Sequence, residues 1–356
     1  MTASLPQGSI IGIIGGGQLG RMLSVAASRL GFLCHIYDPS AAPPAGQVAY
    51  QVTTAAYDDE AALRAFGNAV DIITYEFENI PTQALDVLQD LAPIHPGREA
   101  LRVSQDRLTE KEFLRNLGLQ TAPFADVTDA ASLDAALAEI GAPAILKTRR
   151  FGYDGKGQAR IASRDQAAAA LKEIQNAPAI IEGFVDFTHE VSVIAARSLD
   201  GAVAAFDPGE NVHSEGILRS TTVPARLTAA QRTDAVLMAA KIANALNYVG
   251  VLGVELFVTS DGLVVNEIAP RVHNSGHWTQ NGCVVDQFEQ HIRAITGWPL
   301  GDGQRHSDVV MENLIGNDMD RVPELAQSTD CALHLYGKAE TKPGRKMGHV
   351  NRIIRA

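Results

Sequence analysis

Two glutamates that flank a turn signal have the spacing of a metal site. Glu255 and Glu267 lie in apolar, β-branched runs, and Ser260-Asp261-Gly262 separates these runs. The pattern predicts a β-hairpin with a three-residue loop, which places the two carboxylates directly opposite each other. Like charges in opposite positions destabilise a strand pair, and burying them costs more. Because oxygen ligands suit Mg²⁺, we interpret the pair as a metal site rather than as two exposed glutamates.

The segment after the second glutamate is rich in hydrogen-bond donors and poor in core-forming residues. It reads Pro270-Arg271-Val272-His273-Asn274-Ser275-Gly276-His277. The planar guanidinium of Arg271 suits a carboxylate, bicarbonate or acyl phosphate. We therefore interpret this segment as a functional loop.

A basic, glycine-rich segment lies between a predicted strand at 144–147 and another that ends at Ile161. Its glycines and cations are Lys147, Arg149, Arg150, Gly152, Gly155, Lys156 and Gly157. A flexible loop of this composition suits closure over phosphates, although it is not a Walker A loop. A merely mobile hairpin loop is the alternative, but such a loop does not usually concentrate so many cations.

The elements that position these residues begin with a βαβ pattern. A predicted strand enters Gly15-Gly16-Gly17-Gln18-Leu19-Gly20, and a predicted helix follows from Gln18 to Leu30. With Asp38 at the end of the next strand, this is formally the fingerprint of an NAD(P)-dependent dehydrogenase. The alternative is that a βαβ unit needs glycines in its tight turn whatever it binds.

Three later segments bring further polar residues into the fold. The predicted strand 71–75 ends in Glu76-Phe77-Glu78-Asn79, where parallel sheets bind ligands. Ser104 is predicted as the N-cap of a helix that carries Arg107 and ends at Leu117. Strands at 309–314 and 331–335 are predicted to form a third unit, which Lys338 and the cationic loop 343–349 follow.

The composition limits the class of protein. The 356 residues allow two or three domains, and 46% hydrophobic and 20% charged residues are typical of a soluble globular protein. A net charge of -11 argues against non-specific nucleic-acid binding. Cys34, Cys283 and Cys331 are widely spaced, so we expect a reducing cytoplasm rather than a disulfide framework or a zinc site. No apolar run approaches the length of a membrane span.

The basic loop, the opposed carboxylates and the donor-rich loop together favour one chemistry. Carboxylates can hold Mg²⁺ against nucleotide phosphates, and lysines can neutralise the charge of a transferring phosphoryl group. The residues therefore predict an ATP-dependent ligase that activates a small, carboxylate-like acid.

Seven motifs carry a resemblance to a known family across nearly the whole chain. They are GGGQLGRM (15–22), TYEFENIP (74–81), SQDRLTEK (104–111), FGYDGKGQ (151–158), HSEGILR (213–219), NEIAPRVHNSGHWTQ (266–280) and PGRKMGH (343–349). The sequence resembles the ATP-grasp superfamily and, within it, the N5-carboxyaminoimidazole ribonucleotide synthetase family. The resemblance implies an α/β protein with an α+β centre. It has a Rossmann-like domain at 1–103, an ATP-grasp region at 104–300 with a lid at about 123–185, and a small C-terminal domain at 301–356.

The resemblance also implies which residues bind ATP and its metal ion. Phosphate contacts fall to Arg107, Lys147 and the loop residues Gly152, Tyr153, Asp154, Gly155, Lys156, Gly157 and Gln158. Adenine and ribose contacts fall to Glu182, Gly183, Phe184, Val185, Glu190 and His213. Glu255 and Glu267 would ligate Mg²⁺, with Mn²⁺ as an alternative, and Asn266 would lie beside them. Strict strand alternation, however, turns Asn266 to the opposite face.

Two further sets are implied for the other substrates, 5-aminoimidazole ribonucleotide and bicarbonate. Contacts to the ribonucleotide fall to Gln18, Glu76, Asn79, Asn274 and Ser275, with Lys338, Arg345 and Lys346 on its phosphate. Catalysis where bicarbonate meets the amine falls to Tyr153, Asp154, Lys156, Arg271 and His273.

The activity implied by the resemblance is a step of purine biosynthesis. ATP would phosphorylate bicarbonate to carboxyphosphate, and the ribonucleotide amine would then be carboxylated, with release of ADP and phosphate. The resemblance further suggests a cytoplasmic homodimer with no nucleic-acid or membrane partner. The alternatives are a formate-dependent glycinamide ribonucleotide transformylase and, on residues 15–38 alone, the dehydrogenase.

Overall fold

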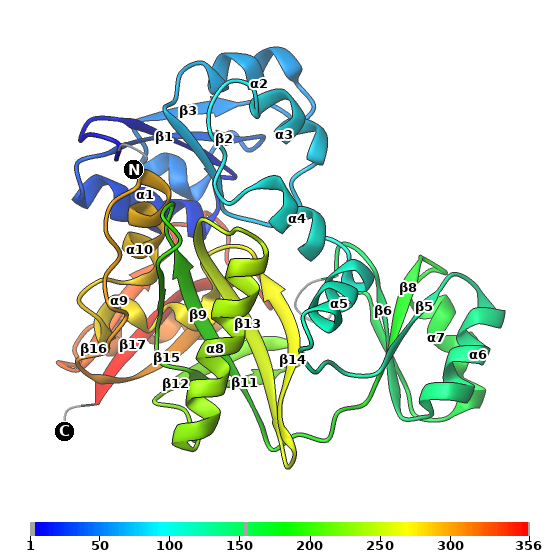
Figure 1. Ribbon diagram of the computed structural model, residues 1–356. Coiled ribbons are helices and arrows are strands. Elements are labelled where there is room, and N and C mark those ends of the chain that lie inside the picture. The colour runs from blue at the N-terminus through cyan, green and yellow to red at the C-terminus, as the bar shows by residue number, and fades with distance from the viewer. Residues whose placement is uncertain (1–3, 153–155, 355–356) are drawn as a thin grey trace.

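The computed structural model describes residues 4–152 and 156–354, which form three β-sheets with helices packed around them (Figure 1). The first sheet is parallel, with the order β3-β2-β1-β4. Its elements are β1 (Ile10–Ile14), α1 (Gln18–Arg29), β2 (Leu33–Asp38), η1 (Pro44–Gln47), β3 (Gln51–Thr54), α2 (Glu60–Gly67), β4 (Ile72–Tyr75) and α3 (Thr82–Leu88). Since helices follow parallel strands here, this is the predicted Rossmann-like unit.

The second sheet is a small antiparallel unit that projects from the rest of the molecule (Figure 1). We call it the lid sheet. Its strands have the order β5-β8-β6-β7. Two helices pack on it, and a separate apolar core lies between the helices and the sheet. The elements are β5 (Phe124–Val127), α6 (Ala130–Ile140), β6 (Ala144–Thr148), β7 (Gln158–Ile161), η2 (Arg164–Gln166), α7 (Ala167–Glu173) and β8 (Ala179–Gly183).

The third sheet is the largest, with the order β14-β13-β9-β11-β12-β15-β17-β16 and β10 beside β9. Its strands are β9 (His189–Arg197), β10 (Val203–Ala205), β11 (Gly209–Ser214), β12 (Ile217–Val223), β13 (Gly250–Thr259), β14 (Gly262–Ala269), β15 (Asp308–Ile315), β16 (Cys331–Leu335) and β17 (Lys346–Ile354). Its helices are α8 (Ala229–Ala245), η3 (Asn274–Gly276), α9 (Thr279–Gly282), α10 (Gln287–Thr296), η4 (Gly316–Arg321) and α11 (Val322–Leu325).

The predicted C-terminal strands are present, and they extend this large sheet rather than form a sheet of their own. β15 pairs with β12 along Ser220–Val223, and β17 then pairs with both β15 and β16. The predicted loop 343–349 is also partly strand, because β17 begins at Lys346. Strand order depends on contacts between distant segments, which local sequence patterns do not contain.

Two short helices, α4 (Arg98–Ser104) and α5 (Arg107–Asn116), connect the first sheet to the lid sheet. The N-cap of α5 is Asp106, whose carboxylate accepts the N–H groups of Leu108 and Thr109 at 3.1 and 3.3 Å. The prediction of Ser104 as this cap is wrong, because Ser104 ends α4 and its hydroxyl donates to the Ala100 carbonyl at 2.9 Å. An aspartate and a serine are equally good caps by type, so the sequence alone did not separate them.

The hairpin of β13 and β14 has the predicted pairing of Glu255 with Glu267, but it reaches this pairing by a different route. The turn has two residues rather than three, because Gly262 already pairs with Thr259. One extra residue, Asn266, then bulges from β14 and shifts the register back. The bulge also breaks the strand alternation on which the predicted orientation of Asn266 depended.

None of the helices in the described part of the chain is both long and apolar enough to cross a bilayer.

Candidate active site

The face of the large sheet that carries Glu255 and Glu267 is a dense arrangement of charge. Arg107 of α5 donates to Glu267 at 3.0 Å. Burial alone would raise the pKa of Glu267, but this guanidinium lowers it below its ordinary value. Burial and the charge of Glu267 together raise the pKa of Glu255 to about 7. A divalent cation would relieve this repulsion, so the donor set fits the Mg²⁺ that the sequence implies.

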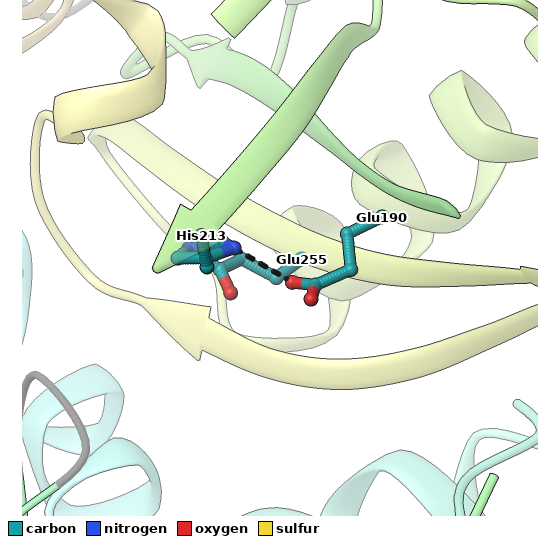
Figure 2. A group of neighbouring side chains, drawn as sticks. All are labelled: Glu190, His213 and Glu255. Carbon is teal, nitrogen blue, oxygen red and sulfur yellow. Dashed lines mark ion pairs between the residues drawn. The ribbon is translucent and has the colours of Figure 1, made fainter. Parts of the chain in front are cut away.

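A glutamate–histidine pair lies beside these carboxylates (Figure 2). His213 Nδ1 is 3.0 Å from Glu190 Oε2, and the two come from β11 and β9. Burial opposes the charged imidazole, but the neighbouring Glu190 raises the pKa of His213. The structure therefore brings together the two residues expected near the ribose and the two expected to bind metal.

A buried lysine that the sequence interpretation did not assign links this sheet to the lid sheet. Lys111 Nζ donates to the Asn266 carbonyl at 2.6 Å and lies 3.4 Å from Glu182 Oε2. Its side chain is 1% exposed. Lys111 thus binds the carbonyl of the bulged residue of β14, and α5 thereby connects the strand that carries Glu267 to β8.

Lys147 and Glu182 form an ion pair inside the lid sheet, at 3.1 Å. Burial would raise the pKa of Glu182, but Lys147 and Lys111 lower it to about 2. Burial also lowers the pKa of Lys147. After β8, the amides of Gly183 and Phe184 bond to Pro123 and Pro143 carbonyls, whereas the described residues offer the Val185 amide no partner. This free N–H at the strand end suits the adenine contact that the sequence predicts.

The other cations expected at the phosphates have structural partners. Arg149 donates to Asp106 at 2.9 Å and to Asp126 at 3.3 Å, and Arg150 donates to Gln105 at 2.8 Å. Arg149 is thereby held against Asp106, the N-cap of α5.

The loop between β6 and β7 is described on both sides of a gap. Tyr153, Asp154 and Gly155 lie outside the described residues. Gly157 has φ of +71° and its carbonyl accepts the Thr148 amide at 2.7 Å. A Cβ at this position would lie 2.6 Å from Thr148 Oγ1, so glycine is required. Gly152 lines the cavity described below, and Lys156 and Gln158 are exposed.

Arg271 is held in place by a residue of the first domain. Its guanidinium donates to both carboxylate oxygens of Glu78, at 2.5 and 3.2 Å. Burial would raise the pKa of Glu78, but Arg271 lowers it to about 2. A bidentate pair of this kind fixes the guanidinium plane. Nη1 also donates to the Val272 carbonyl at 3.2 Å, so one N–H on each terminal nitrogen remains for a ligand.

The donor-rich loop is anchored largely within the protein. His273 Nδ1 lies 2.8 Å from Ser275 Oγ, and its Nε2 lies 3.4 Å from Glu255. Ser275 is 1% exposed and accepts the Ser192 hydroxyl at 2.6 Å. Asn274 exchanges amide hydrogen bonds with Asn313 at 2.8 and 2.9 Å. These contacts position the loop. Burial lowers the pKa of His273 to about 3, so its imidazole is neutral at pH 7.

The glycine-rich turn before α1 is filled by the protein's own carboxylates. Glu76 accepts the N–H groups of Gly17 and Gly20, and Asp38 accepts that of Gly16 at 2.7 Å. A dinucleotide pyrophosphate would need these same N–H groups at the helix N-terminus. The dehydrogenase alternative is therefore wrong. Burial raises the pKa of Glu76 although both N–H groups favour its ionised form.

The remaining candidate residues lie around the junction of the first domain and the C-terminal strands. Gln18 is the first residue of α1. Lys338 Nζ donates to the Lys346 carbonyl at 2.6 Å, and Arg345 donates to the Glu340 carbonyl at 3.0 Å. The Lys346 ammonium lies near Glu255 and His213, where its charge opposes the rise in the pKa of both.

A cavity of about 60 Å³ lies beside Arg107, Glu267 and Arg271. Three parts of the chain line it: the end of the first sheet, the start of α5, and β14 with the loop that follows. The lining includes Glu78, Asn79, Gln105, Arg107, Glu110, Gly152, Glu267, Arg271 and His273. The cavity therefore brings together Arg107 and Gly152 of the candidate ATP residues, Glu267 of the metal pair and Asn79 of the ribonucleotide set.

Sequence reasoning missed Glu78, Glu110 and Lys111. Glu110 is 2% exposed and accepts the Ile268 amide at 2.5 Å, and burial raises its pKa to about 8. A helical signal was present, because residues 110 and 111 lie three and four positions after Arg107 and share its face. Glu78 lies two residues from Glu76, but nothing local indicates Arg271 as its partner.

Three family models match successive parts of the chain. The ribonucleotide synthetase preATP-grasp domain matches residues 9–105, and the ATP-grasp domain matches residues 112–288. The phosphoribosylaminoimidazole carboxylase C-terminal domain matches residues 309–355.

Relatives of known name match the chain over almost its full length. The N5-carboxyaminoimidazole ribonucleotide synthase of Brucella melitensis is 56% identical over 353 residues, which is 98% of each chain. The Staphylococcus aureus N5-carboxyaminoimidazole synthetase complexed with ADP is 39% identical, with a TM-score of 0.94 over 99% of this chain and 95% of that one. The Aspergillus clavatus enzyme in complex with ADP and 5-aminoimidazole ribonucleotide is 31% identical, with a TM-score of 0.92 over 98% of this chain and 94% of that one. The chain therefore belongs to the N5-carboxyaminoimidazole ribonucleotide synthase family of ATP-grasp ligases.

Proposed function

We infer that this protein is an ATP-dependent carbon–nitrogen ligase of purine biosynthesis. It carboxylates 5-aminoimidazole ribonucleotide to N5-carboxyaminoimidazole ribonucleotide. The observation that carries this inference is the shared cavity, where Asn79, Arg107, Glu267 and Arg271 converge from separate parts of the fold. Family membership supports it, since one relative is described with both ADP and the ribonucleotide.

We assign the sheet face and the lid sheet to ATP and its metal ion. Glu255 and Glu267 would hold Mg²⁺, or Mn²⁺, and the bound ion would offset the charge of the nucleotide phosphates. Lys147 and Arg107 bind those phosphates by exchanging their present carboxylate partners for phosphate oxygens. Adenine meets the backbone at Val185. The loop from Gly152 to Gln158 adds further contacts to the phosphates. We also assign to the nucleotide or its metal ion the residues Asn266, Gly183, Phe184, Glu182, Glu190 and His213.

Bicarbonate and the amine react in the cavity beside Arg271. Bicarbonate takes the γ-phosphoryl group of ATP, which leaves ADP and carboxyphosphate. The amine nitrogen then bonds to the carboxyl carbon, phosphate departs, and the nitrogen loses a proton. Arg271, fixed by Glu78, stabilises the negative charge of the acyl phosphate. His273 is neutral and can accept a hydrogen bond, and we assign Tyr153, Asp154 and Lys156 to the loop that excludes water.

The ribonucleotide lies between the first domain and the C-terminal strands in this proposal. Gln18, Glu76 and Asn79 face its base and sugar, and Asn274 and Ser275 hold the loop beside its amine. Lys338, Arg345 and Lys346 bind its phosphate through charge. We also propose a cytoplasmic homodimer, which the family resemblance suggests and sedimentation velocity would test. Three free thiols are compatible with a reducing compartment.

The test of the proposed function is phosphate release from ATP in the presence of Mg²⁺. One reaction contains 5-aminoimidazole ribonucleotide and bicarbonate, and the other contains glycinamide ribonucleotide and formate. We expect turnover only with the first pair. Turnover only with the second pair would overturn the assignment in favour of a transformylase.

A further inference from the structure

The side chains of Glu190, His213 and Glu255 form a mixed cluster on the large sheet, which we call the Glu–His–Glu cluster (Figure 2). One ligand atom from each residue lies within 4.8 Å of the other two. The three side chains are 24%, 22% and 15% exposed, so the cluster is partly shielded but open to solutes.

Strand pairing explains why these residues meet. Glu255 pairs with Ser192, two residues from Glu190, so the two carboxylates share a face of β9 and β13. β11 pairs with β9 only along Gly209–Asn211, and its register against β12 shifts between Val212 and His213. This bulge turns the imidazole toward Glu190.

The cluster is unusual for a site that serves only Mg²⁺. Magnesium prefers a shell of oxygens, whereas an imidazole nitrogen beside two carboxylates suits first-row transition metals. His213 Nδ1 is buried and, although 3.0 Å from Glu190, does not meet hydrogen-bond geometry with a described residue. His213 Nδ1 thus lies close to a carboxylate oxygen without a well-aligned hydrogen bond to it. The nearby ammonium of Lys346 opposes a cation, but Glu267 adds a third carboxylate close to Glu255.

We propose that the Glu–His–Glu cluster binds a first-row transition-metal ion of the Zn²⁺ or Co²⁺ class when nucleotide is absent. This inference rests on the proposed function in one respect. Glu190 and Glu255 are there assigned to the ribose and to Mg²⁺, so the transition-metal ion and the magnesium nucleotide exclude each other. The cluster is then a regulatory site at which such an ion inhibits the enzyme competitively with ATP.

Titration of the nucleotide-free protein with Co²⁺ tests the site without any activity measurement. Visible d–d absorption bands report the ligand set, and we expect one ion per chain. His213→Gln and Glu190→Gln should each weaken Co²⁺ binding by at least about tenfold. His189→Gln is the matched control, because His189 precedes Glu190 on β9 but lies outside the cluster. Glu267→Gln should keep the Co²⁺ bands while it loses ATP turnover.

The outcomes separate this site from the proposed function. Equal Co²⁺ affinity in His213→Gln and the unaltered protein, with the same melting temperature, would overturn the metal site. The whole inference is supported if His213→Gln loses the bands and if magnesium ATP displaces the bound Co²⁺ from the unaltered protein. If the bands persist at saturating magnesium ATP, the exclusion is wrong and Glu190 and Glu255 do not serve the nucleotide, although the metal site itself stands.

Discussion

At the scale of single residues, the cations that we propose to bind ligands are held by carboxylates. Arg107 pairs with Glu267, Lys147 with Glu182, and Arg271 with Glu78. Buried charges are tolerated only when they are paired. Each anionic substrate group must therefore replace or share a carboxylate, and a bound cation compensates for the carboxylates that are released.

Glu267→Gln should abolish ATP turnover while the protein remains folded. The change keeps the side-chain shape but removes a charge that faces Glu255 and Arg107. We expect the rate of phosphate release to fall by at least about 100-fold, as when a group that stabilises transition-state charge is lost. The melting temperature should shift little, since repulsion with Glu255 is relieved.

Glu215→Gln, at an exposed turn, is the control for this change. A wild-type rate of phosphate release in Glu267→Gln would remove the metal assignment.

Lys338→Ala and Arg345→Ala should raise the KM for 5-aminoimidazole ribonucleotide and leave the KM for ATP almost unchanged. The reason is the loss of a charge proposed to bind the ribonucleotide phosphate, and an increase of about tenfold is expected. Lys342→Ala is a matched control in the same segment, because Lys342 is 64% exposed and pairs with Glu340. Steady-state kinetics with each substrate varied gives the answer, and equal increases for both substrates would contradict this division.

At the scale of elements, the hairpin shows what sequence patterns can and cannot predict. Periodicity placed Glu255 opposite Glu267, and the structure confirms this pairing. The predicted three-residue loop was wrong, yet the bulge at Asn266 compensates for the shorter turn. Gly297 is the C-cap of α10, where it adopts φ of +75°, which glycine reaches without strain. Local geometry of this kind is encoded in a few neighbouring residues, whereas the bulge depends on Lys111 of a distant helix.

Deletion of Asn266 should abolish ATP turnover more completely than Asn266→Ala. Without the bulge, the register moves by one residue and one segment of β14 must turn its side chains to the other face. Glu267 would then leave Glu255, or the apolar residues nearer the turn would leave the core. Asn266→Ala keeps the backbone carbonyl that Lys111 binds, so it should retain part of the activity. Phosphate release and thermal melting measured for both variants test the point, and equal activities would contradict it.

At the scale of the whole molecule, the first and third sheets are connected by buried polar contacts. His291 of α10 bonds to Thr74 of β4 at 2.8 Å and accepts the Val251 amide of β13 at 3.1 Å. The sequence predicted the elements on both sides but not their joining, because the partners are separated by 217 and 40 residues. For the same reason, the sequence could not predict the ion pair of Lys111 with Glu182 or that of Glu78 with Arg271.

Stability should fall as the pH is lowered from about 6.5 toward 4. Burial lowers the pKa of His291 to about 3 and of His334 to about 4, and His334 stacks on buried His349 at 4.5 Å. These imidazoles are neutral when folded and become protonated on unfolding below their ordinary pKa of 6.5. Their contribution to the free energy of unfolding is therefore complete above pH 6.5. At pH 5, each histidine has lowered this free energy by about 2 kcal/mol.

Thermal melting across this pH range checks the expectation. His334→Gln should reduce the slope, whereas His306→Gln, which alters an exposed imidazole, should not. An unchanged slope in His334→Gln would exclude this histidine as a source of acid sensitivity.

The continuation of the large sheet through β15 has a consequence for dissecting the protein. Removal of residues 309–356 would leave the backbone of Ser220–Val223 on β12 as an unpaired edge. Such an edge is a template for association with other chains, so we expect the truncated protein to aggregate in size-exclusion chromatography rather than to yield a soluble ATP-binding fragment. The lid sheet has its own apolar core. We therefore expect that the lid sheet can be separated from the rest of the molecule. The C-terminal strands cannot, because their backbone pairs with β12 and protects the ATP-grasp sheet from self-association.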